Sequence, residues 1–186
     1  PLGEKSTVKP GMYNLVIQKE GYFPVIERIN IKPDPEAYML KHRLISKPRK
    51  LNVVIKSSFN NSKITPDTMI LGTENIKDGQ EIKPGVYALL IKKKGYKSLS
   101  DEVVIEPSEK PYLLERMLEA LPVVVKYQLT NDFDGKLTTP DVITLNDKPV
   151  DQKAAFLPGK YNLKIEKIGY NPIRQEVLIE PSDEAY

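Results

Sequence analysis

The polar segment at 131–135 holds the residues of this chain whose types and spacing best suit chemistry. Asp132 and Asp134 alternate ahead of a glycine, and Asp141 follows further along. Alternating carboxylates before a glycine can present several oxygens to calcium. The first ligand position of such a loop would fall on Thr130, and Asp-Gly between two strands is also an ordinary hairpin turn. We therefore expect a turn here, with calcium binding as the alternative.

His42 is the only histidine of the chain, and there is no cysteine. The absence of cysteine excludes disulfides, thiol catalysis and zinc–thiolate sites. A serine–histidine–acid triad or a metal-hydrolase centre cannot be assembled around one histidine whose counterpart in the repeat described below is Arg116. We expect His42 to be a solvated strand residue, and the chain to be non-enzymatic, with no catalytic residue and no cofactor.

The chain matches itself when it is shifted by 74 residues. The first copy carries Pro10-Gly11, Gly21-Tyr22, Pro33 and Tyr38, which return as Pro84-Gly85, Gly95-Tyr96, Pro107 and Tyr112, and again as Pro158-Gly159, Gly169-Tyr170, Pro181 and Tyr186. Nine of the ten tyrosines fall into such triplets, and Tyr127 does not. A fixed period of this length predicts tandem copies of one folding unit. A residue that every copy needs is most simply a packing residue, so we expect these tyrosines to pack.

Within each copy, apolar residues recur at every second position, which is the pattern of a half-buried strand. The core-facing residues of the first such strand are Tyr13, Leu15 and Ile17, then Tyr87, Leu89 and Ile91, then Tyr161, Leu163 and Ile165. After a tight turn at Gly21, Gly95 or Gly169, a second strand turns Ile29 and Ile31, Val103 and Ile105, or Val177 and Ile179 to the core. Further strands are expected over Leu51, Val53 and Ile55, over Val125, Tyr127 and Leu129, over Met69 and Leu71, and over Ile143 and Leu145.

A third alternating stretch follows the second strand, as Tyr38–Leu44 in one copy and Tyr112–Leu118 in the next. Residues 112–120 are also rich in helix formers. Equivalent segments should fold alike, however, and Tyr38–Leu44 lacks that composition, so we predict strands in both places. Five short strands per copy, separated by turn residues, predict an all-β fold of tandem small antiparallel β-sandwich repeats with a 74-residue period.

The period divides the chain into two and a half units. We place a partial repeat at 4–47, a complete repeat at 48–120 and a repeat lacking its last strand at 121–186, with short joints around Pro48 and Pro122. Units of this size bury only about 60% of their extended surface, so contacts between neighbours should contribute to stability. Incomplete end units expose backbone edges that invite pairing with another chain. We expect partial disorder at the ends or self-association through these edges.

Composition excludes several classes of protein. Apolar residues make up 40% of the chain and charged residues 28%, as in ordinary soluble domains. No apolar run approaches the roughly 20 residues that a membrane helix needs. The net charge of +3 is spread along the chain, so no nucleic-acid partner is expected. Residues 1–3, Pro-Leu-Gly, look like the remainder of a cleaved affinity tag, and a native signal peptide or anchor would then lie upstream.

Short turn motifs recur in every copy. The middle copy has Thr65-Pro66, Lys83-Pro84-Gly85-Val86-Tyr87 and Lys94-Gly95-Tyr96; the last has Thr139-Pro140, Leu157-Pro158-Gly159-Lys160-Tyr161 and Gly169-Tyr170-Asn171-Pro172; the first has Pro10-Gly11-Met12-Tyr13 and Gly21-Tyr22-Phe23-Pro24. This arrangement resembles the PEGA family of bacterial repeat domains. The resemblance implies a prealbumin-like or carbohydrate-binding-like β-sandwich in an exported, periplasmic or cell-surface protein, with no catalytic residues.

Isopeptide-linked pilin or adhesin domains also carry a Pro-Gly-x-Tyr-x-Leu strand followed by Gly-Tyr. Their cross-link needs a buried acid, which in those families lies two residues after the leucine. Here that position is occupied by Ile17, Ile91 and Ile165. We therefore do not expect an isopeptide bond.

These observations together favour a non-enzymatic spacer and protein-interaction module of a bacterial envelope protein, self-associating or bound to a protein partner. Outward strand positions such as Val16, Leu90, Val104 and Leu178 are more apolar than a solvated face, so we expect a neighbour or partner to cover them. The alternative is a module that binds cell-wall glycan. With no tryptophan and most tyrosines assigned to packing, few aromatic platforms are left for sugars.

Overall fold

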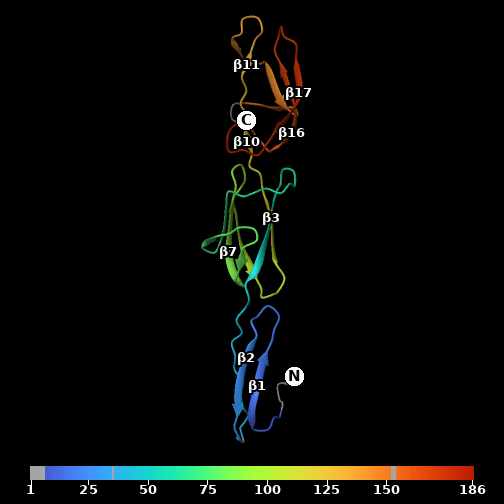
Figure 1. Ribbon diagram of the computed structural model, residues 1–186. Coiled ribbons are helices and arrows are strands. Elements are labelled where there is room, and N and C mark those ends of the chain that lie inside the picture. The colour runs from blue at the N-terminus through green and yellow to red at the C-terminus, as the bar shows by residue number, and fades with distance from the viewer. Residues whose placement is uncertain (1–6, 35, 152–153) are drawn as a thin grey trace. The chain divides into compact units, whose positions relative to one another are not determined.

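The chain is all-β in a computed structural model that describes residues 7–34, 36–151 and 154–186 (Figure 1). No helix occurs among these residues, so none is long and apolar enough to cross a membrane. The strands are β1 (Gly11–Ile17), β2 (Val25–Ile31), β3 (Arg49–Ser57), β4 (Thr68–Leu71), β5 (Glu74–Asn75), β6 (Glu81–Ile82), β7 (Gly85–Lys92), β8 (Leu99–Ile105), β9 (Tyr112–Leu118), β10 (Val123–Val124), β11 (Leu129–Thr130), β12 (Leu137–Thr138), β13 (Val142–Leu145), β14 (Lys148–Pro149), β15 (Ala155–Phe156), β16 (Gly159–Glu166) and β17 (Ile173–Ile179). The predicted all-β class is confirmed. The predicted tag at 1–3 lies outside the described residues.

Two compact units make up the described chain. Unit 1 contains the residues up to Asn52 together with Asp78–Val86 and Val104–Tyr112, and unit 2 contains Val53–Lys77, Tyr87–Val103 and Leu113–Tyr186. The boundary passes through the segment that we predict to be the complete repeat. The predicted repeat boundaries therefore stay a prediction, and each unit is described by itself.

In unit 1, β1 and β2 form an antiparallel hairpin whose register runs from Gly11 opposite Ile31 to Ile17 opposite Val25 (Figure 1). Gly21 provides the expected tight turn with φ of 79°. The alternation places Leu15 and Ile29 in the buried positions. Tyr13 departs from the expectation, because its ring is exposed and its hydroxyl donates to the Lys9 carbonyl at 2.6 Å.

The strand predicted at Tyr38–Leu44 does not form. Its counterpart β9 does form, and it joins the β6–β3–β9 sheet by pairing with β3. A strand is stable only where its backbone groups find partners. The described residues before 45 include no strand equivalent to β3, so Tyr38–Leu44 has no ladder to join. The prediction was wrong there and right for β9.

Unit 2 contains four-stranded sheets of one pattern. One sheet has the order β5–β4–β7–β8, in which the first two residues of β7 and the last two of β8 belong to unit 1, and the other has the order β14–β13–β16–β17. The second sheet pairs Val142 with Glu166 and Gly159 with Ile179, both in antiparallel ladders. Its core cluster consists of Val123, Val125, Leu145, Val150, Phe156 and Ile179. Side chains buried elsewhere in unit 2 include Leu89, Ile91, Val103, Leu114 and Leu118.

The pairing of β9 with β3 runs parallel, which differs from the predicted antiparallel arrangement. At the start of the strands, in unit 1, Arg49 contacts the carbonyl of Pro111. At their end, in unit 2, the Ser58 amide donates to the Leu118 carbonyl at 3.0 Å. Both strands therefore advance in the same direction.

The strand predicted over Val125, Tyr127 and Leu129 is interrupted. Only β10 and β11 form there, and the residues between them are not in a strand. β3, by contrast, lies between β6 and β9 and extends unbroken over nine residues. In the described chain, β10 has β15 on one side and only Tyr186 on the other. The missing ladder accounts for the interruption.

Leu114 and Leu113 provide a matched test of the β9 assignment, because Leu114 is fully buried and Leu113 is 56% exposed. We predict that Leu114→Ala lowers the free energy of unfolding by about 2–5 kcal/mol through lost apolar contact and a residual cavity. Leu113→Ala should change it by less than about 0.5 kcal/mol. Urea denaturation followed by circular dichroism measures both. A helix over 112–120, or a slipped strand, would reverse or equalise the two losses.

Candidate functional site: the junction contacts

Within unit 1, the turn between β1 and β2 packs against the turn that follows β8. A Cβ atom built on Gly21 would lie 2.5 Å from the Ser108 nitrogen and 2.6 Å from the Pro107 carbonyl carbon. These distances are shorter than any real side-chain contact, and the atoms are backbone. Only glycine permits this approach. We call this contact the first junction.

Within unit 2, Gly95 makes the same contact 74 positions later. Its Cβ atom would lie 2.7 Å from the Ser182 nitrogen and 2.8 Å from the Pro181 carbonyl carbon. Both glycines are buried and have positive φ, 79° for Gly21 and 75° for Gly95. We call this contact the second junction. The two junctions use the same residue types at the same offset.

Backbone hydrogen bonds beside each glycine also recur at that offset. In the first junction Phe23 donates to Ile45 and Lys47 donates to Gly21, both at 2.8 Å; in the second Lys97 donates to Glu119 at 2.8 Å and Leu121 donates to Gly95 at 2.9 Å. The residues between them form isolated antiparallel bridges, Tyr22 with Ser46 and Tyr96 with Ala120. Each glycine turn is therefore hydrogen-bonded to the segment that precedes the next strand, residues 45–47 at the first junction and 119–121 at the second.

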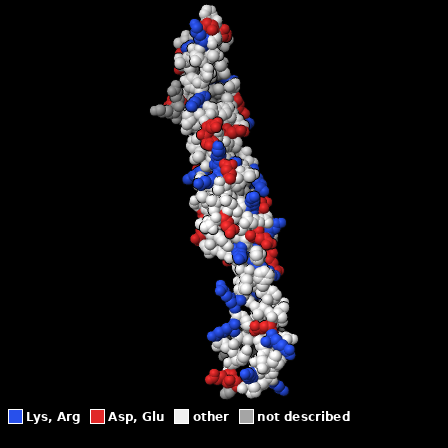
Figure 2. Space-filling model, turned by 60° about the vertical axis from the view of Figure 1, so that its left-hand side comes forward, with Lys and Arg blue, Asp and Glu red and all other residues white. Residues whose placement is uncertain are grey.

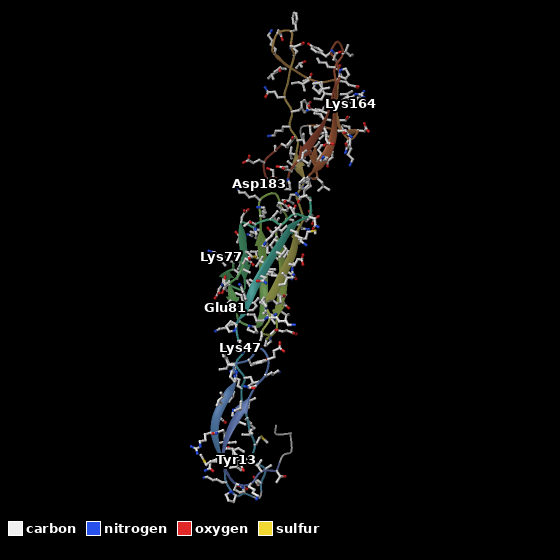
Figure 3. All side chains as sticks on the ribbon, turned by 45° about the vertical axis from the view of Figure 1, so that its right-hand side comes forward. Tyr13, Lys47, Lys77, Glu81, Lys164 and Asp183 are labelled. Carbon is white, nitrogen blue, oxygen red and sulfur yellow. The ribbon has the colours of Figure 1, made fainter. Side chains whose placement is uncertain are left out.

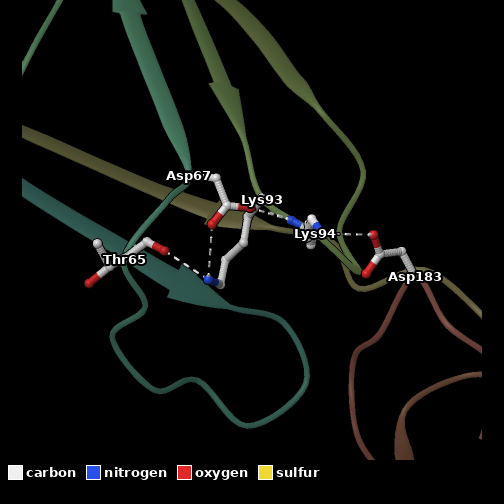
Figure 4. A network of polar contacts seen from close by, with 5 residues as sticks. All are labelled: Thr65, Asp67, Lys93, Lys94 and Asp183. Carbon is white, nitrogen blue, oxygen red and sulfur yellow. Dashed lines mark hydrogen bonds and ion pairs between the residues drawn. The ribbon is translucent and has the colours of Figure 1, made fainter.

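Ion pairs accompany both junctions but differ in strength. In the first, Lys47 Nζ lies 2.9 Å from Glu109 Oε1 (Lys47 is labelled in Figure 3). In the second, Lys94 Nζ lies 3.9 Å from Asp183 Oδ2 (Figure 4). All four side chains are substantially exposed, and exposed pairs stabilise by only about 0–1 kcal/mol. The close backbone packing, rather than charge, dominates these contacts.

An aspartate side chain accepts a hydrogen bond from the turn that contains Lys94 and Gly95 at the second junction (Figure 4). Asp67 Oδ2 accepts a hydrogen bond from the Lys94 amide at 2.8 Å, and Lys93 Nζ donates to the Thr65 carbonyl at 2.8 Å. The same pair of bonds recurs near the end of the chain, where Asp141 Oδ2 accepts from the Ile168 amide at 2.7 Å and Lys167 Nζ donates to the Thr139 carbonyl at 2.8 Å. Asp67 and Asp141 therefore order the hairpin turns.

The calcium candidate at 131–135 is a hairpin turn, as expected, and Asp134 caps it. Hydrogen bonds from the Lys136 amide and ammonium, and then from Asn131, hold the pKa of Asp134 below its usual value. Asp141 is engaged with the Ile168 amide instead. Among the described residues, no three histidine or acidic side chains gather where they could hold a metal ion. The structure does not bring the proposed calcium ligands together.

Arg49 is the residue of the first junction that sequence reasoning missed. Within unit 1 its guanidinium donates to three backbone carbonyls, those of Glu106 at 2.8 Å, Lys110 at 2.9 Å and Pro111 at 3.2 Å. It also lies over the Tyr112 ring, 5.4 Å from the centroid. Arg49 thereby fixes the turn that packs on Gly21. Its counterpart in the last copy is Val123, so the repeat offered no signal for it.

His42 and Arg116 occupy equivalent positions and have equivalent partners. His42 Nε2 lies 3.3 Å from Glu27 Oε1, and Arg116 lies 2.7 Å from Asp101 Oδ2. The Arg116 hydrogen bond holds the pKa of Asp101 below its usual value. His42 is exposed as expected, but it is paired and does not lie in a strand, because its segment has no strand to pair with. At the positions tested for an isopeptide acid, Ile91 and Ile165 are buried apolar residues.

The repeated tyrosines are packed less uniformly than expected. Tyr96 is only 9% exposed and Tyr22 is half-buried, whereas Tyr170 is 43% exposed. Tyr22 and Tyr96 form the bridges at the junctions, and Tyr170 follows Gly169, which has no atom within 4 Å of its virtual Cβ. The tyrosine is therefore more buried in the two copies where the glycine before it packs against a Pro-Ser turn.

Comparison with known proteins does not identify a family for this chain. No family model matches the chain, and no curated protein matches it. A solved structure of the Bacillus anthracis TIE protein is similar at a TM-score of 0.41 and 16% sequence identity, over 95% of this chain and 40% of that one. The chain thus spans less than half of that protein. The resemblance to PEGA domains stays a hypothesis.

Gly95 and Gly169 provide a matched test of the second junction. Both have positive φ, so alanine at either position costs about 1–2 kcal/mol of backbone strain. Only at Gly95 does the new methyl meet a backbone neighbour, which should add about 1–3 kcal/mol. We predict that Gly95→Ala destabilises unit 2 more than Gly169→Ala does, measured by urea denaturation. Equal losses would show that the close approach at Gly95 contributes nothing.

Arg49 is tested against its neighbour Lys50, which carries the same charge on an exposed side chain. We predict that Arg49→Ala lowers the free energy of unfolding by about 2 kcal/mol, because three charge-assisted hydrogen bonds are lost and carbonyls are left without a donor. Arg49→Lys should recover only part of this, since an ammonium lacks the planar fork. Lys50→Ala should stay within about 0.5 kcal/mol. If Lys50→Ala matched Arg49→Ala, the loss would be one of charge alone.

Proposed function

We propose that the chain is a non-enzymatic spacer and protein-interaction module, made of PEGA-like repeats in an exported protein of the bacterial envelope or surface. The observation that carries the proposal is the recurrence of one junction contact in two places. Gly21 and Gly95 each admit a following Pro-Ser turn so closely that no side chain fits between the backbones. A spacer needs such contacts, because they limit the orientations that successive repeats can adopt.

The joints support this role in a second way. The segments 45–47 and 119–121 are bonded to the glycine turns before the chain enters the next strand, and β3 begins at Arg49 with no free linker residue other than Pro48. Proline restricts its own φ and the conformation of the residue before it. The joint therefore behaves as an ordered segment and not as a flexible coil.

An interaction role is supported by apolar side chains on the outward faces of the strands. Val16 lies opposite Ile26 in the β1–β2 ladder, and these side chains are 54% and 72% exposed. Val104 and Leu178 are 52% and 40% exposed, and Leu90 is half-buried. On the face drawn in Figure 2, acidic and basic side chains are intermingled around uncharged areas. The outward faces thus suit contact with another protein, which we propose as the partner class.

Glycan binding is the rival function. The tyrosines are the aromatic residues that would have to stack on sugar rings. The hydroxyls of Tyr13 and Tyr161 donate to the Lys9 and Leu157 carbonyls, and Tyr96 is buried with its hydroxyl 2.8 Å from Ser57 Oγ. These contacts favour a structural role for the rings, and no feature of the described residues favours a sugar site.

The spacer proposal is tested by residual dipolar couplings measured across both junctions. We predict that couplings from 11–47, 49–118 and 123–179 fit one alignment tensor, which is what a spacer with ordered joints requires. Insertion of a glycine–serine linker after Lys47 should separate the first tensor from the other two. Three different tensors in the unmodified chain would overturn the spacer role. Sedimentation with isolated peptidoglycan should leave the chain in the supernatant, and retention would instead support glycan binding.

A further inference from the structure

A pair of large apolar side chains is exposed beside the first junction. Phe23 and Ile45 lie opposite each other next to the bridge between Tyr22 and Ser46, and the Phe23 amide donates to the Ile45 carbonyl at 2.8 Å. Their side chains are 49% and 66% exposed. Side chains at opposite positions of antiparallel segments are close neighbours. Unit 1 therefore presents two large apolar side chains to solvent in one place.

The second junction has a charged pair at the same two positions. Lys97 and Glu119 are the counterparts of Phe23 and Ile45. Their side chains are 3.7 Å apart as an ion pair and are 70% and 73% exposed. These are therefore surface positions in both junctions, including the one where the neighbouring β9 is paired with β3. Since a solvated ion pair serves equally well there, the apolar pair is not required for packing within the repeat.

Basic side chains adjoin the apolar pair. Lys41 and Arg43 precede Ile45 at every second position, and all three side chains are exposed. Among the described residues, no acidic side chain forms an ion pair with Lys41 or Arg43. Their counterparts on β9 are Glu115 and Met117, which are also exposed. The surface of unit 1 is therefore cationic where the equivalent surface of unit 2 is acidic.

The charge that is spread along the chain has a local excess in the same region. Residues 7–52 contain nine lysines and arginines and four aspartates and glutamates, whereas residues 53–186 contain 18 and 20. A surface with an excess of one charge attracts a partner of the opposite charge. The basic and apolar side chains together indicate a partner that has negative charge beside an apolar layer.

We propose that the surface formed by Phe23, Lys41, Arg43 and Ile45 binds the face of an anionic lipid bilayer. Acidic headgroups would attract the two basic side chains, and Phe23 and Ile45 would enter the boundary between headgroups and acyl chains. An acidic protein surface would match the charge alone, whereas a bilayer provides both the charge and the apolar layer. The inference rests on the envelope location included in the proposed function, and it concerns a different surface from the outward faces of the strands.

Sedimentation with sucrose-loaded vesicles tests the basic half of this surface. We expect the chain to bind vesicles of phosphatidylglycerol and phosphatidylcholine mixed in equal parts, to bind phosphatidylcholine vesicles far less, and to be released by added salt. Lys41→Gln with Arg43→Gln should weaken binding about 30-fold, since each basic side chain near an anionic surface contributes a factor of about five. The matched control, Lys63→Gln with Lys148→Gln, removes the same charge from exposed side chains of unit 2 and should change binding less than about twofold.

A second variant tests the apolar half. Phe23→Lys with Ile45→Glu copies the ion pair of the second junction into the first, so net charge is unchanged and the fold is one that accepts this pair. We expect binding to weaken at least about tenfold, because the apolar contact with the bilayer is lost. Since the chain has no cysteine, an environment-sensitive fluorophore can be attached at Ile45→Cys and, as a control, at Glu119→Cys. Vesicles should shift the emission of the first label to shorter wavelength and leave that of the second unchanged.

Equal binding to both kinds of vesicle would overturn the proposal, and so would equal losses in the two glutamine pairs or full binding by the Phe23→Lys, Ile45→Glu variant. A chain that binds neither kind of vesicle would also overturn it and would favour an acidic protein as the partner. The spacer role is tested separately, because the alignment tensors report on the joints and vesicle binding reports on one surface of unit 1.

Discussion

The contact on which the rest of this structure depends is the approach of one backbone to another at Gly21 and Gly95. Each glycine must reach a positive φ, which it does without a steric cost, and each must also lack a Cβ atom. The two requirements arise from different neighbours, the hairpin's own turn and the following Pro-Ser turn. A residue such as asparagine tolerates the first requirement but not the second. The repeated glycine therefore encodes a tertiary contact as well as a turn.

Much of the fold follows from the period and the alternation of apolar residues. The alternation correctly placed β1, β2, β7, β8, β16 and β17, because these strands pair with close neighbours in sequence. It failed at Tyr38–Leu44 and around Tyr127, because the described chain provides no partner strand for those stretches, whereas β3 and β9 pair with each other. The alternation of apolar residues predicts which side chains of a strand are buried, but it does not predict which strands pair along its edges.

The candidate site was less predictable than the fold. Gly21 and Gly95 were recognisable as turn residues, but nothing in a single sequence indicates which backbone a glycine will touch. Asp141 was considered only as a calcium ligand, and the capping role that it shares with Asp67 emerges only when the Lys94 and Ile168 amides are seen beside them. Arg49 was hidden for the opposite reason, since its contacts occur in one junction and the period therefore gives it no weight.

The contacts that recur at the two junctions differ in kind from those that do not. What recurs at the junctions is backbone packing and backbone hydrogen bonding, while the side chains around them vary from Lys47 and Glu109 to Lys94 and Asp183. Backbone contacts tolerate changes in neighbouring side chains, so the two junctions share the same backbone contacts although the side chains around them differ.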